Sequence, residues 1–126
     1  MAEINIRDLS IGDWVRHTFY EENLQIKRID GESERLLVEK GLMSVSCHLD
    51  HFEPIPLTPE ILEKNGISKT YESDEYAVYK GEGFNVTEYY TELWEFERHR
   101  NRLMIRSVHQ LQHALRLAGV GKEIEL

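Results

Sequence analysis

The chain has 126 residues, of which 40% are hydrophobic and 30% charged, and its formal net charge at pH 7 is −8. This length and the twelve Tyr, Phe and Trp residues predict a folded domain and exclude a largely disordered chain. The negative charge disfavours unspecific binding to nucleic acid or to an anionic membrane surface.

The first fifty residues contain four short segments typical of β-strands. Asp30-Gly31 and Gly41 supply turns between them, because glycine adopts the positive φ that tight turns require. The expected strands cover residues 11–20, 24–29, 35–39 and 43–48. Four turn-linked strands in so short a stretch predict a strongly bent sheet or a small SH3-like barrel.

A proline-rich stretch at residues 52–59 follows, and its prolines favour an extended backbone. Thr58 is a typical N-cap with Pro59 at the first helical position, so a helix of about two turns is expected to end at Gly66. The stretch divides one expected domain, residues 1–126, into sub-halves 1–53 and 54–126.

Apolar and polar residues alternate again after Tyr71, which indicates antiparallel strands. The expected strands are residues 75–80, 84–90, 92–99 and 103–106, with a turn at Arg100-Asn101. Trp94 and Phe96 share one face of the third of these strands and predict its core side.

The last expected element is a helix that packs on the sheet. Ser107 and Gln110 match the Ser-x-x-Gln capping box, and Gly119 predicts its end. Its apolar stripe consists of Val108, Leu111, Ala114, Leu115 and Ala118. Residues 122–126 are expected to add a short strand. The whole pattern predicts a strand-rich α+β fold.

Charge is distributed unevenly along the second half. Residues 72–97 hold eight acids and one lysine, whereas residues 98–121 hold five arginines and no acid. Arg98, Arg100, Arg102 and Arg106 surround the expected turn, and such a hairpin can contact phosphate. In the other interpretation, Arg98 and Arg106 pair across strands with an acidic face. That face would consist of Glu88, Glu92, Glu95 and Glu97.

The histidines and the single cysteine give no catalytic set. His109 and His113 have the helical i, i+4 spacing of a metal site, but they lie far from the apolar stripe and are expected to face solvent or a partner. Cys47 and His48 are adjacent in a strand, so they point to opposite faces and cannot share a proton. We expect Cys47 to be a small core residue, with no cofactor and no bound metal.

Three segments together resemble a known group of sequences. They are Leu-Ser-Ile-Gly-Asp-Trp-Val at 9–15, Phe-Glu-Pro-Ile-Pro-Leu-Thr-Pro-Glu-Ile-Leu at 52–62, and Val-His-Gln-Leu-Gln at 108–112. Their order is similar to that in a family of short uncharacterised proteins from gut anaerobic bacteria and their prophages and mobile elements. The resemblance implies a similar fold and an accessory, mobile-element context, and it transfers no catalytic residue.

These observations predict a cytoplasmic, non-enzymatic accessory protein that binds another macromolecule, with a protein as the expected partner and a homodimer as one form. No signal peptide and no membrane-spanning run are recognised, so no membrane partner is expected. The expected interaction residues are Arg98, Arg100, Arg102, Arg106, His109 and His113. The alternative is a nucleic-acid-binding module that uses the arginine hairpin.

Overall fold

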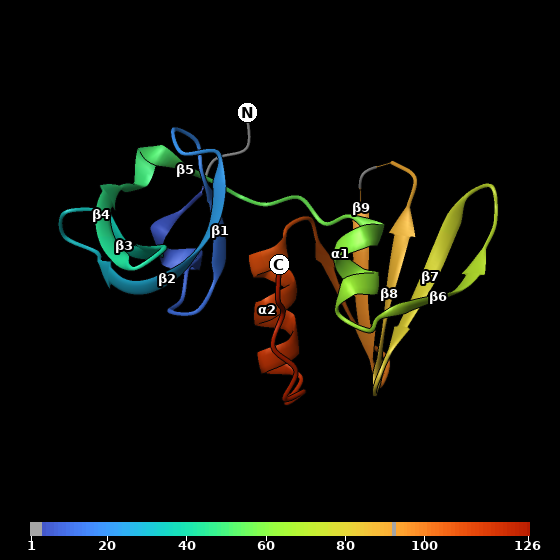
Figure 1. The fold of residues 1–126 in the computed structure, drawn as a ribbon. Helices are drawn as coiled ribbons and strands as arrows, with labels where there is room; N and C mark the ends of the chain where they lie inside the picture. Colours follow the sequence, from blue (N-terminus) through green and yellow to red (C-terminus); the bar gives the residue numbers. More distant parts are fainter. Residues whose placement is uncertain (1–3, 92) are drawn as a thin grey trace. The chain divides into compact units, whose positions relative to one another are not determined.

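The computed structural model describes residues 4–91 and 93–126, and the chain folds as two compact units, Met1–Ile55 and Pro56–Leu126 (Figure 1). Each unit contains one antiparallel five-stranded sheet, and both α-helices belong to the second unit. The strand-rich α+β prediction is therefore confirmed. Among the described residues, no helix is long and apolar enough to cross a membrane.

The first unit is a curved antiparallel sheet (Figure 1). Its elements are the 3-10 turn η1 (Ile6–Asp8), β1 (Trp14–His17), β2 (Glu22–Asp30), β3 (Arg35–Lys40), β4 (Met43–His48), the 3-10 turn η2 (Leu49–His51) and β5 (Phe52–Glu53). The strand order is β4-β3-β2-β1-β5, and the register shifts between Ile26 and Arg28 in β2. No pairing joins β4 to β5 among the described residues, so the sheet is open and not a closed barrel.

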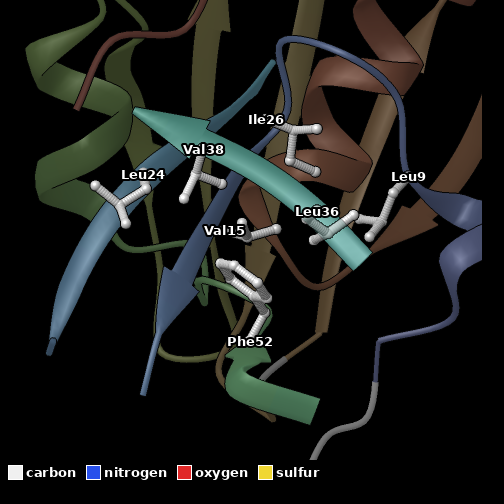
Figure 2. Packing of buried hydrophobic residues seen from close by; sticks show 7 residues of the cluster. All are labelled: Leu9, Val15, Leu24, Ile26, Leu36, Val38 and Phe52. Atoms are coloured by element: carbon white, nitrogen blue, oxygen red, sulfur yellow. The ribbon is translucent and has the colours of Figure 1, made fainter. Parts of the chain in front are cut away.

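The core of the first unit follows the period of two that a half-buried strand requires. Val15 pairs with Leu24, and Ile26 pairs with Val38, so that their side chains share one face. Figure 2 shows the seven buried side chains together: Leu9, Val15, Leu24, Ile26, Leu36, Val38 and Phe52. Cys47 is half-buried against this cluster, as the sequence predicted.

The second unit is an antiparallel meander with two helices. Its elements are α1 (Pro59–Lys64), β6 (Ser68–Glu72), β7 (Tyr76–Gly81), β8 (Phe84–Tyr89), β9 (Leu93–Arg98), β10 (Asn101–Ile105) and α2 (Val108–Leu117). The strand order is β10-β9-β8-β7-β6. Buried residues of this sheet, such as Tyr79, Val86, Trp94 and Phe96, lie on the face to which the helices also contribute buried side chains.

Both helices begin as predicted. The Thr58 hydroxyl accepts a hydrogen bond from the Ile61 amide at 3.3 Å, and the Ser107 hydroxyl accepts one from the Gln110 amide at 3.4 Å. The Gln110 side chain accepts from the Arg106 amide at 2.6 Å instead of completing the capping box at Ser107. Gly119 ends α2 with a φ of +72°.

Three local predictions are wrong. Strand β6 was not expected, because all five of its residues are exposed at a sheet edge and show no apolar alternation. The hairpin turn lies at His99-Arg100, where both φ angles are positive, one residue earlier than predicted. Residues 122–126 form no strand. The Asn65 side chain instead hydrogen-bonds to the backbone of this segment: its Oδ1 accepts from the Glu125 amide at 2.7 Å. Glu92, expected to begin a strand, lies outside the described residues.

Candidate interaction surface

The arginine-rich segment forms the β9–β10 hairpin. Arg98 pairs with Asn101 in the strand register, and Arg102 pairs with Glu97. Among the described residues β10 hydrogen-bonds with no strand other than β9, so its outer edge is unpaired. Leu103 and Met104 on this edge are 45% and 49% exposed. An exposed strand edge with apolar side chains is a site at which another chain can add a strand.

Among the described residues, one hairpin arginine forms a cross-strand ion pair, and it is neither of the two that were expected to do so. The Arg102 Nε lies 3.2 Å from the Glu97 Oε2 and 4.0 Å from the Glu95 Oε1. Arg98 and Arg106 were expected in this role. Arg98 cannot fill it, because it alternates with Glu97 and so shares the opposite face with Phe96. Arg106 follows the last paired residue of β10.

The other hairpin arginines keep their charge available. In the described part of the chain, the side chains of Arg98, Arg100 and Arg106 form no ion pair. Arg100 and Arg106 are exposed, and Arg98 is half-buried. A guanidinium group without a carboxylate partner favours contact with an external anionic group.

A cavity of about 350 Å³ lies between this hairpin and α2. Its apolar lining comes from Phe96, Leu103, Ala114, Leu117 and Ala118, and its polar lining from Arg98, His99, Asn101 and Arg102. Leu117 is 84% exposed. We call this cavity together with the outer edge of β10 the β10–α2 groove. Its lining combines apolar side chains with the basic Arg98 and Arg102, and it contains no acidic residue.

His109 and His113 lie on α2, with ring centroids 5.9 Å apart. The prediction that both face solvent is wrong for His109, which is 5% exposed and has its Nδ1 3.2 Å from the Ser107 hydroxyl. The helical wheel assumed a single buried stripe, whereas His109 and Gln112 are buried in addition to the apolar positions. The structure therefore places neither histidine in the lining of the β10–α2 groove. Across residues 4–91 and 93–126, no group of three metal-ligating side chains is present.

Cys47 and His48 do not form a catalytic pair. The His48 Nδ1 accepts a hydrogen bond from the Asp50 amide at 3.1 Å, and its Nε2 lies 3.8 Å from the Glu34 Oε2. These contacts cap the η2 turn and explain the position of His48 by local structure. The cysteine instead packs against the core of the first unit.

Sequence reasoning did not single out His17, which is the most buried histidine of the described residues at 3% exposure. Its Nδ1 accepts a hydrogen bond from the Tyr20 amide at 3.1 Å. The ring stacks on Tyr20 and on His51, at centroid distances of 4.2 Å and 5.7 Å. The available signal was its spacing of two residues from Val15, which places both side chains on the buried face of β1.

Burial, followed by the nearby His51, lowers the pKa of His17 below its ordinary value of 6.5. The unfolded chain therefore binds more protons here than the folded chain as the pH falls below 6.5. We expect the stability of the first unit to be complete above that pH and to decrease as the pH approaches the lowered pKa. Urea unfolding followed by Trp14 fluorescence in a Trp94→Phe background measures this. The variant His17→Asn keeps a hydrogen-bond acceptor but does not titrate, so it should reduce the change of unfolding free energy with pH. If the unfolding free energy of His17→Asn changed with pH as steeply as that of the wild type, the assignment to His17 would be wrong.

No protein-family model matches the chain, and comparisons with curated proteins and with solved structures also find no match.

Proposed function

We propose that the chain is a non-enzymatic module that binds another protein, and that its binding site is the β10–α2 groove. One observation carries this proposal: an unpaired strand edge runs beside an apolar cavity whose charged lining is entirely basic. Strand edges supply main-chain hydrogen bonds, and neighbouring pockets supply specificity for side chains.

The lining of the groove indicates the chemistry of the partner segment. An extended segment added to β10 would project alternate side chains toward the α2 side, where Leu103 and Leu117 offer apolar surface. A carboxylate on the same segment would meet the half-buried Arg98. We therefore propose an extended partner segment in which an apolar residue lies close to an Asp or Glu.

The first unit is proposed to have an SH3-like topology. In support, β5 follows a 3-10 turn and pairs with β1, and β2 changes its register between its pairings with β1 and β3. With the resemblance described above, we propose an accessory protein of a mobile element that acts in the cytoplasm.

The test is site-specific photo-cross-linking in a host lysate. A photoreactive amino acid replaces Leu117 in the groove, and a matched control replaces Phe19, which is 79% exposed in the first unit. We expect a protein that cross-links at position 117 and not at 19, survives nuclease treatment, and is lost when Leu103→Asp places an acid in the groove. Equal cross-linking at both positions, or no effect of Leu103→Asp, would disprove the assignment.

The nucleic-acid alternative rests on three arginines that form no ion pair with another described residue: Arg98, Arg100 and Arg106. It predicts that species recovered in the same experiment disappear on nuclease treatment and weaken steeply with salt. Recovery of nucleic acid would put this alternative first.

A further inference from the structure

A second cavity lies in the second unit, beside the ends of both helices. Its volume is about 610 Å³, and its lining comes from the segment after α1, the β7–β8 turn, the end of β9 and the segment after α2. It shares Arg98 with the β10–α2 groove and no other lining residue. We call it the glycine-lined cavity, because its lining includes Gly66, Gly81, Gly119 and Gly121.

Two cations from separate parts of the chain line this cavity. Arg98 ends β9 and Lys122 follows α2, and both residues are half-buried. Neither forms an ion pair with another described residue. Because partial burial makes a cation without a carboxylate partner costly, an external anion in this cavity would be attracted to both groups.

The backbone that carries Lys122 is held in place. The Asn65 side chain bonds to the main chain of Glu125 through both its nitrogen and its oxygen, and Ile124 is buried. The Lys122 Nζ lies 3.8 Å from the point that a Cβ at Gly66 would occupy. A ligand therefore meets an ammonium group on a fixed segment, so binding requires little ordering of the chain.

The main chain adds a hydrogen-bond donor to the lining. The amides of Gly119 and Val120 bind the carbonyl oxygens of Arg116 and Leu115, which reduces the partial negative charge at this end of α2. The Gly121 amide has no acceptor in the described part of the chain, and a Cβ there would meet nothing within 4 Å. Open main chain with an unbonded N–H favours the close approach of an anionic oxygen.

One acidic residue, Glu82 in the β7–β8 turn, shares the lining. It is exposed, and among the described residues it forms no ion pair with Arg98 or Lys122. The two cations therefore leave one positive charge in excess. The Glu82 carboxylate should oppose the binding of an anion, so its removal and the removal of Lys122 have opposite expected effects.

We propose that the glycine-lined cavity binds the phosphate group of a small molecule, with Arg98 and Lys122 as charged contacts and the Gly121 amide as a main-chain donor. A phosphate group offers three terminal oxygens to these donors, whereas a carboxylate offers only two. The volume of about 610 Å³ leaves room for the body of a phosphate monoester as well as for inorganic phosphate. This site does not depend on the function proposed for the β10–α2 groove.

A nuclear magnetic resonance titration of the isotope-labelled chain with inorganic phosphate, at constant ionic strength, tests the site. We expect saturable shifts of the Gly119, Gly121 and Lys122 amide signals, and no such response to sodium acetate. Lys122→Gln should raise the phosphate dissociation constant at least about tenfold, because it removes a charged donor. Lys27→Gln makes the same change at an exposed lysine of the first unit and should leave that constant unchanged. The spectra also show that each variant folds.

Glu82→Gln tests the electrostatic argument in the opposite direction, since it should lower the phosphate dissociation constant by about threefold. Lys122 and Glu82 do not line the β10–α2 groove, so cross-linking at position 117 should persist in both variants and reports separately on the groove. Shifts that do not saturate, or acetate that binds as tightly as phosphate, would overturn the proposal. So would a Lys122→Gln variant that binds phosphate like Lys27→Gln, or a Glu82→Gln variant that binds it no more tightly than the wild type.

Discussion

Gly81→Ala is expected to destabilise the second unit by about 1–3 kcal/mol, the usual cost of forcing an extra methyl group into a packed site. A Cβ at position 81 would overlap the ring of Phe84, which faces Gly81 across the β7–β8 hairpin. The ring has nowhere to move, because it is 4% exposed and stacks on Phe96 with centroids 5.5 Å apart. Since Phe96 also lines the β10–α2 groove, the groove should be disturbed as well.

Urea unfolding followed by the fluorescence of Trp94, in a Trp14→Phe background, measures this loss. Gly121→Ala is the matched control, because a Cβ there meets nothing within 4 Å. Combining Gly81→Ala with Phe84→Leu should recover part of the stability, since the smaller side chain relieves the overlap. If Gly81→Ala and Gly121→Ala lowered the free energy of unfolding equally, overlap with the Phe84 ring would not be the reason that position 81 requires glycine.

Asn65→Ala is expected to lower the free energy of unfolding by about 2–4 kcal/mol, because several hydrogen bonds are lost at a buried position. The Asn65 Nδ2 donates to the Ile61 and Glu125 carbonyl oxygens, both at 2.8 Å, and its Oδ1 accepts from the Glu125 amide. Asn65 is 7% exposed, and Ile124 beside the bonded segment is 3% exposed. Losing this side chain therefore releases the final residues from the end of α1.

The contact uses the main chain of Glu125, which supplies a clean control. Glu125→Ala keeps both main-chain hydrogen bonds and should leave the unfolding free energy unchanged. Hydrogen exchange at the Glu125 amide should accelerate in Asn65→Ala and stay protected in Glu125→Ala. An amide that remains protected without the Asn65 side chain would disprove the role given to it.

Local patterns in the sequence were sufficient wherever short-range chemistry decides the structure. Thr58 and Ser107 cap the two helices because a hydroxyl bonds an amide three residues later, which needs no distant partner. Trp94 and Phe96 are buried as predicted, because side chains alternate along any strand. Strand 43–48 was predicted with its observed bounds, between the turn at Gly41 and the 3-10 turn that His48 caps.

The tertiary structure decided the features that depend on which segments become neighbours. Strand β6 forms because β7 offers a partner edge, although all five residues of β6 are exposed and each is either polar or aromatic. The register assigned the ion pair to Arg102 and turned Arg98 to the opposite face, a choice that a shift of one residue would reverse. The burial of His109 likewise depends on what packs against α2 outside its apolar stripe. The Asn65–Glu125 contact joins residues that are far apart in the chain. Sequence thus predicted both helices and the strands that have a buried apolar face, because those features depend on local periodicity. The β10–α2 groove required the assembled unit, because its lining comes from β9, β10 and α2 together.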